Sequence, residues 1–185
     1  MPLTGVDAGT EREVEEPLMD EVSEAVRLAV AGRVSQPARG FTELADRVAI
    51  VDAVRAYALA IDERRWDLLA EVLTEDHQFR GTGPDGRPLD ALDGRSALVA
   101  WLEDYLGALG AQLRHHFTGV LVTEQGPDDA TVLAYLLLTS AAADGVQVVS
   151  TAVYRVSLVR VDGAWRISRL DAAFDGAPRE AKERP

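Results

Sequence analysis

The sequence predicts an α+β domain in which a curved, mostly antiparallel sheet wraps around three helices and leaves an internal pocket. Three observations predict this fold. Apolar residues recur every three or four positions in segments between residues 41 and 109. Four long runs rich in Val, Leu, Tyr and Thr follow, and two Asp-Gly pairs separate the later runs. We expect residues 1–40 to form a partly helical or flexible extension, 41–175 the domain, and 176–185 a tail.

The first helix is expected to follow Thr42, an acceptable N-cap, and to end at the polar tract 62–65. The apolar stripe of this helix consists of Val48, Val51, Val54, Ala58 and Ile61. The later elements of this half are expected at 66–73 (short helix), 77–80 (short strand), 81–94 (a loop rich in Gly, Pro and Asp) and 95–109 (a helix ended by Gly110).

The second half is predicted to be an antiparallel meander of four strands, at 113–123, 130–142, 146–161 and 164–174. Several of these runs exceed the usual strand length of about 5–6 residues, so the sheet should bend strongly. Both faces of the strands are largely apolar. One face should meet the helices, and we expect the other to be covered by a second copy of the chain in a homodimer.

Composition excludes several classes of function. The formal net charge is −12 without a run of basic residues, which argues against nucleic-acid binding. The chain has no cysteine, so disulfides and cysteine nucleophiles are excluded. No stretch approaches the ~20 apolar residues of a membrane span, and no secretory signal is recognisable, so we expect a cytoplasmic protein. The three histidines lack metal-ligand spacing, and no phosphate-binding or nucleophile motif occurs. We therefore expect no metal.

The first acid/base candidates are Tyr57 and Asp62, five positions apart near the end of the first helix. An ionisable pair at the junction of a helix and a turn could face a cavity bounded by the rest of the chain. The Asp62 carboxylate could orient a histidine or act as the base itself, and the Tyr57 phenol could donate a hydrogen bond to a substrate oxygen. The alternatives without a function are that Asp62 only forms the turn and that the Tyr57 ring only packs in the core.

His115 and His116 open the first long strand, and side chains alternate along a strand. Only one of the two can therefore face the pocket. We expect His115 there, on the same face as Phe117, Gly119 and Leu121. Histidine, with an ordinary pKa near ~6.5, suits proton transfer at neutral pH. His116 is expected to be structural or interfacial, and His77 to lie at the surface.

Several motifs carry a family resemblance. They are Tyr57–Asp67 (YALAIDERRWD), Leu73–Asp76 (LTED), Gly94, Trp101-Leu102, His115–Gly119 (HHFTG), Tyr154 and Arg160–Ile167 (RVDGAWRI). With the order of elements, they resemble the SnoaL-like branch of the nuclear-transport-factor-2-like superfamily, whose fold is a cone. The resemblance covers about residues 41–175. It implies the cone-shaped fold, whereas the scaffold itself hosts many functions.

The resemblance implies a cofactor-independent general acid–base enzyme, a dehydratase, isomerase or cyclase (a lyase or isomerase of the polyketide-cyclase type). Its substrate would be an apolar oxygenated small molecule such as a polyketide or steroid-like compound. Catalytic members use a Tyr and an Asp from the end of the first helix and a His from the first long strand, which correspond here to Tyr57, Asp62 and His115. We expect the substrate pocket to be lined by Phe117, Tyr135, Tyr154, Trp101 and Asp171.

Two departures from the family pattern leave alternatives open. The second long strand lacks the carboxylate of steroid-isomerase-like members, and Gly119 replaces a common Asn four residues after the histidine. One alternative is a non-catalytic binding or assembly subunit, like the small subunit of ring-hydroxylating dioxygenases. That alternative expects the three candidate side chains to be buried together without an open cavity. A second alternative is an epoxide hydrolase with an Asp–Arg–Asp relay, to which Arg155 or Arg169 could contribute.

Overall fold

The computed structural model describes Arg27 and residues 40–176. The expected extension over 1–40 and the tail over 176–185 lie almost wholly outside the described residues. The helices of the domain are α2 (Phe41–Asp62), α3 (Trp66–Val72) and α4 (Arg95–Ala108). The first helix begins one residue before Thr42, with Gly40 at the N-cap position, so the expected side-chain cap is wrong.

The strands form one six-stranded sheet in the order β2-β1-β6-β5-β4-β3. All neighbours pair antiparallel except β1 and β6, which pair parallel. The predicted α+β fold is confirmed. The strands are β1 (Leu73–Thr82), β2 (Leu92–Asp93), β3 (Gln112–Gln125), β4 (Asp129–Ala142), β5 (Gly145–Val161) and β6 (Ala164–Phe174).

The first strand differs most from its prediction. Leu73, expected in the second helix, has extended backbone and starts β1, which is longer than the short strand expected at 77–80. The cause is long-range, because β1 pairs with β6, some ninety residues later, and that pairing has no local sequence signal. The expected loop after β1 is also partly ordered, since the Leu89 N–H donates to the Gly81 carbonyl at 2.8 Å.

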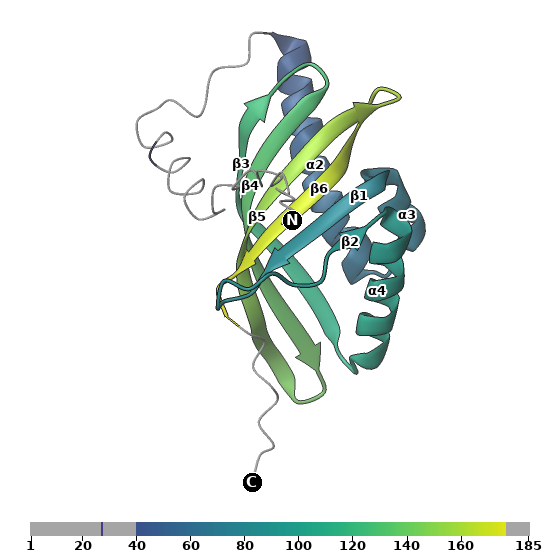
Figure 1. The fold of residues 1–185 in the computed structure, drawn as a ribbon, viewed down its shortest axis with the longest axis vertical. Helices are drawn as coiled ribbons and strands as arrows, with labels where there is room; N and C mark the ends of the chain where they lie inside the picture. Colours follow the sequence, from purple (N-terminus) through teal and green to yellow (C-terminus); the bar gives the residue numbers. More distant parts are fainter. Residues whose placement is uncertain (1–26, 28–39, 177–185) are drawn as a thin grey trace, which may run out of the picture.

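The predicted meander β3–β6 is present, and Asp-Gly pairs lie at the β4–β5 and β5–β6 connections. At the β5–β6 turn both Asp162 (φ 51°) and Gly163 (φ 80°) adopt positive φ. A two-residue turn of this kind matches the right-handed twist of the flanking strands. The four strands then curve around one side of α2, while α3 and α4 lie near β1 and β2 (Figure 1).

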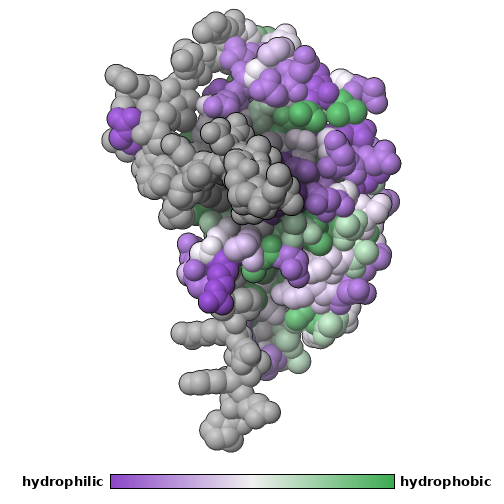
Figure 2. Space-filling view, viewed as in Figure 1, coloured by the Kyte–Doolittle hydropathy of each residue, from purple (hydrophilic) through white to green (hydrophobic). Residues whose placement is uncertain are grey.

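The core lies between α2 and the face of the sheet that carries Leu136, Leu138 and Tyr154, here called the inner face. The opposite face, with Tyr135, Leu137 and Asp171, is called the outer face. On the side of the molecule seen in Figure 2, apolar residues form separate patches between hydrophilic ones. Within the described residues, no helix is long and apolar enough to cross a membrane.

Strand β3 contains a bulge that changes which side chains face inward. Its register with β4 shifts between Thr118 and Leu121, and Gly119 has φ 59°. Val122 is consequently buried in the core, and Leu121 is not part of it. The expectation that Gly119 and Leu121 share the face of His115 is therefore wrong, because simple alternation ends at the extra residue of a bulge.

Candidate functional site

A cavity of about 360 Å³ lies between the inner face of the sheet and the helices. This volume is in the range of small-molecule sites. The exposed fractions of Leu89 (47%) and Trp101 (46%) put these two side chains at its mouth, whereas Tyr57 and Tyr154 are each only 5% exposed. The wall is mostly apolar and includes Ile61, Phe79, Leu98, Leu102, Leu106, Leu113, Leu136, Leu138, Val149 and Phe174.

The candidate base His115 lines this cavity and is held from behind by Asp62. The Asp62 carboxylate accepts two hydrogen bonds, from His115 Nδ1 at 2.6 Å and from the His115 backbone N–H at 2.9 Å. With Nδ1–H donated to a carboxylate, Nε2 is the ring nitrogen left for a ligand. Carboxylate and imidazole are both well enclosed, with side chains 4% and 13% exposed.

Hydrogen bonds join the end of α2 to the free edge of the sheet, and they explain why Asp62 lies against His115. Strand β3 is an edge strand, so alternate backbone N–H groups have no strand partner, and Asp62 supplies an acceptor for one of them. The Gln112 side chain also donates to the Asp62 carbonyl at 2.7 Å. Beyond Asp62, Arg64 has φ 53° and the Arg65 N–H reaches the Ala60 carbonyl at 2.7 Å, which ends the helix in a Schellman turn.

Tyr57 lies on α2 and lines the same cavity. Burial, and secondarily the neighbouring Tyr154, hold the pKa of the Tyr57 phenol well above its usual value. Burial likewise raises the pKa of Tyr154. Both phenols therefore stay protonated at neutral pH and can act only as neutral hydrogen-bond donors or acceptors.

The five expected pocket residues fall in different places. Trp101 and Tyr154 line the cavity, and Trp101 stacks on Tyr105 with ring centroids 5.1 Å apart. Phe117 packs behind the wall, edge-on to Tyr154 at 5.2 Å. Tyr135 is 47% exposed on the outer face and does not line the cavity, because its neighbours Leu136 and Leu138 take the inward positions.

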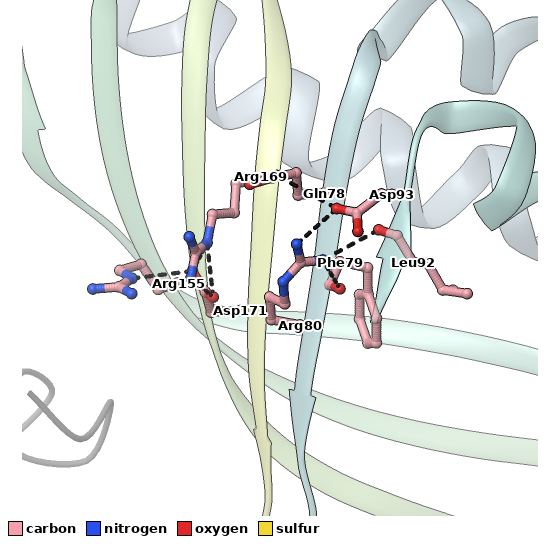
Figure 3. A network of polar contacts seen from close by, with 8 residues as sticks. All are labelled: Gln78, Phe79, Arg80, Leu92, Asp93, Arg155, Arg169 and Asp171. Atoms are coloured by element: carbon pink, nitrogen blue, oxygen red, sulfur yellow. Dashed lines mark hydrogen bonds and ion pairs between the residues drawn. The ribbon is translucent and has the colours of Figure 1, made fainter. Parts of the chain in front are cut away.

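Asp171 also lies on the outer face, where it binds two arginines instead of facing the cavity (Figure 3). Arg169 Nε is 2.9 Å from Oδ1, and Arg155 Nε is 3.3 Å from Oδ2. In the register with β5, Asp171 sits opposite Arg155, one residue out of phase with the inward-facing Tyr154 and Ala172. The arginines considered for an epoxide-hydrolase relay are thus on the wrong face of the sheet for the cavity.

His77, expected at the surface, is fully buried. Its Nδ1 lies 3.3 Å from the Ile167 carbonyl oxygen, and its Nε2 has no hydrogen-bond partner. Burial lowers the pKa of His77 to about 4. The cause of the error is the parallel pairing of β1 with β6, which encloses a strand that looks polar in sequence. His116 is exposed, with Nε2 3.1 Å from Thr139 Oγ1, and does not line the cavity.

Some residues that line the cavity were not predicted from the sequence. Phe79, Ser150 and Phe174 line the cavity, and only the alternation along their strands could have suggested it. The Ser150 hydroxyl donates to the Gly176 carbonyl at 3.3 Å, and Gly176 also borders the cavity. Within residues 40–176, no group of three or more His, Asp or Glu side chains is arranged to hold a metal ion.

A curved sheet folded around a long helix, with a cavity between them, defines the cone-shaped NTF2-like class of proteins. The sequence shows the particular family, because the sequence model of the SnoaL-like domain family matches residues 42–171. The chain belongs to this family. No curated protein sequence matches it.

Three solved structures illustrate the similarity. A single-residue variant of Rv3472 from Mycobacterium tuberculosis, a protein of unknown function, is 26% identical over 75% of this chain and 78% of its own, with a TM-score of 0.64. A protein from Catenulispora acidiphila in complex with S-DNPA is 26% identical over 71% and 95%, with a TM-score of 0.62. Aln2 from a Streptomyces species is 26% identical over 76% and 95%, with a TM-score of 0.63.

Proposed function

We propose that the chain is a cofactor-independent general acid–base enzyme, a dehydratase, isomerase or cyclase, acting on an apolar ketone such as a polyketide or steroid-like compound. The observation that carries the proposal is the His115–Asp62 pair, with Nδ1 2.6 Å from the carboxylate and the ring in the wall of an apolar cavity. The family membership and the S-DNPA complex of a relative are consistent with a small-molecule site.

In this proposal His115 Nε2 removes a proton from the carbon next to a substrate carbonyl. Asp62 stabilises the imidazolium that forms, and the Tyr57 hydroxyl donates a hydrogen bond to the enolate oxygen. In a dehydration the enolate then expels a β-hydroxyl group, which leaves as water with the proton from the imidazolium. Acid–base help of this kind contributes ~10²–10⁴-fold, so the rest of the acceleration comes from positioning in the cavity.

The test uses 3-hydroxy-1-tetralone, whose dehydration gives 1-naphthol and is followed by fluorescence. We expect His115→Ala to lower kcat by at least about 10²-fold. The variant should remain folded, with a lowered unfolding temperature because the buried Asp62 carboxylate loses its imidazole partner. Thr118→Ala, an exposed position on the same strand, serves as the control and should keep the wild-type rate. A His115→Ala variant that turns over at the wild-type rate would exclude His115 as the base.

The open cavity weighs against the alternative of a non-catalytic assembly subunit. That alternative expects the three candidate side chains to be packed together without an open space beside them. Tyr57 and His115 instead both border a cavity of about 360 Å³, and only Asp62 is enclosed behind the wall.

We further propose that a second copy of the chain covers the outer face of the sheet. Strands β4 and β5 expose four large apolar side chains there, Tyr135, Leu137, Val146 and Val148. A group of exposed apolar side chains of this kind is typical of an interface between subunits.

A further inference from the structure

Two buried phenols border the cavity without a protein partner. Tyr57 on α2 and Tyr154 on β5 are each 5% exposed and line the cavity. Among the described residues, neither hydroxyl takes part in a hydrogen bond, although buried phenols normally have a partner. Neither oxygen is among the fully enclosed unpaired atoms either, so each one touches open space. The cavity is that space, and both O–H groups are free to bind something in it.

The two phenols come from different elements, α2 and β5, and lie around one aromatic side chain in a corner of the cavity. Both rings contact Phe117, with centroid distances of 6.4 Å from Tyr57 and 5.2 Å from Tyr154. Charge on one would be felt by the other, since Tyr154 contributes to the raised pKa of Tyr57. Two protonated phenols in this position present two donors and no charge, which suits a neutral acceptor or an oxyanion.

This corner is displaced from the imidazole along the backbone, and its two phenols are more enclosed than the His115 side chain. His115, Leu138 and Ser150 face each other in one row across the sheet, and Tyr154 is four residues further along β5, about 13 Å of strand. On the helix, Tyr57 precedes the Asp62 that holds His115 by five residues, or about 7.5 Å of axis. A ketone that reaches both sites therefore has its oxygen beside the phenols and its adjacent carbon turned toward His115.

We propose that Tyr57 and Tyr154 together form a two-donor site for a single ligand oxygen, a ketone carbonyl or the enolate derived from it. A carbonyl oxygen has two lone pairs and can accept from both phenols. The ligand class is a flat, largely apolar cyclic ketone that enters with its oxygen first. The inference deepens the proposed function and rests on it for the role of Tyr57, while it adds Tyr154 as a second group that touches the substrate.

The experiment compares two probes that differ only in the carbonyl group, 1-tetralone and tetralin. Their affinities are measured by calorimetry, and the carbonyl stretch of bound 1-tetralone by infrared difference spectroscopy. We expect wild type to prefer 1-tetralone and to shift its stretch to lower frequency. Tyr57→Phe and Tyr154→Phe should each weaken 1-tetralone binding about 3–10-fold, as loss of one neutral hydrogen bond does, and leave tetralin binding unchanged. In each variant the carbonyl stretch of bound 1-tetralone should also be shifted less than in wild type.

Tyr135→Phe is the matched control, because it removes a phenol from the outer face and should change neither measurement. The proposal is overturned if Tyr154→Phe keeps the wild-type preference and stretch, if it weakens both probes equally, or if wild type does not prefer 1-tetralone. None of these readouts depends on turnover. Failure of the proposed catalytic role would instead appear as an active His115→Ala variant that still shifts the carbonyl stretch.

Discussion

The buried histidine His77 shows how strongly surroundings determine the chemistry of a side chain. The Ile167 carbonyl accepts from Nδ1–H, so the ring is held as the neutral tautomer with an unpaired Nε2. Burial disfavours the charged form, which lowers the pKa of His77 from 6.5 to about 4. His115, in contrast, has a carboxylate behind Nδ1 and the cavity in front. The same residue type thus serves packing at one site and is a candidate base at the other.

We predict that protonation of His77 contributes to acid unfolding. Because its pKa is lower in the folded than in the unfolded state, the neutral ring stabilises the fold fully above about pH 6.5. This stability falls as the pH drops toward about 4, by about 3 kcal/mol in total. His77→Asn keeps an N–H donor and removes the titration. Urea unfolding between pH 7 and pH 4 should then show a weaker loss of stability in the variant, and equal pH dependence would contradict the prediction.

At the scale of elements, β3 determines which groups reach the cavity. The bulge at Gly119 ends the alternation that begins at His115, and the ring of Tyr135 on β4 covers the glycine from the outer face. A Cβ at position 119 would lie 3.0 Å from Tyr135 Cδ2. Positive φ and this close contact together explain why glycine is required here, where the resemblance would place Asn.

Gly119→Ala should destabilise the fold by about 1–2 kcal/mol, since an L-residue is strained at φ 59° and the tyrosine ring must also move. Thermal or urea unfolding measures the change. Gly107→Ala is the matched control, because Gly107 lies inside α4 with no atom within 4 Å of an added Cβ. That substitution should stabilise by about 0.5–1 kcal/mol. If both substitutions had the same sign, the strain at Gly119 would be refuted.

At the scale of the whole molecule, one face of the sheet lines the cavity, and the opposite face carries the exposed apolar residues for which we propose a partner subunit. The outer face carries the partly buried Arg155–Asp171–Arg169 cluster (Figure 3). It also carries the exposed apolar residues of β4 and β5. We expect Leu137→Glu to convert a dimer into a monomer, because it places a charge at the centre of the proposed interface. Light scattering after gel filtration measures the mass.

Leu59→Glu, at an exposed position of α2, is the control for this substitution and should leave the dimer intact. A wild-type mass of one chain at about 100 μM would contradict the dimer and leave the cavity argument untouched.

Much of the fold could be predicted from local patterns. The 3–4-residue spacing of Val54, Ala58 and Ile61 predicts α2, and the Asp162-Gly163 pair predicts the β5–β6 hairpin. In each case neighbours in sequence are neighbours in space. β1 could be predicted only in part. Its pairing with β6 joins segments far apart in the chain, and that pairing buries His77.

The candidate site could likewise be predicted only in part. The sequence by itself determined which chemical groups were available, with Tyr57, Asp62 and His115 on elements of known type, and it excluded thiol chemistry. Only the tertiary structure decided that Asp62 meets His115 across 53 residues of chain, that Tyr154 faces inward beside Tyr57, and that Asp171 faces outward. The physical reason is that periodicity fixes the relative phase of residues within one element, whereas curvature, bulges and strand order set how separate elements meet.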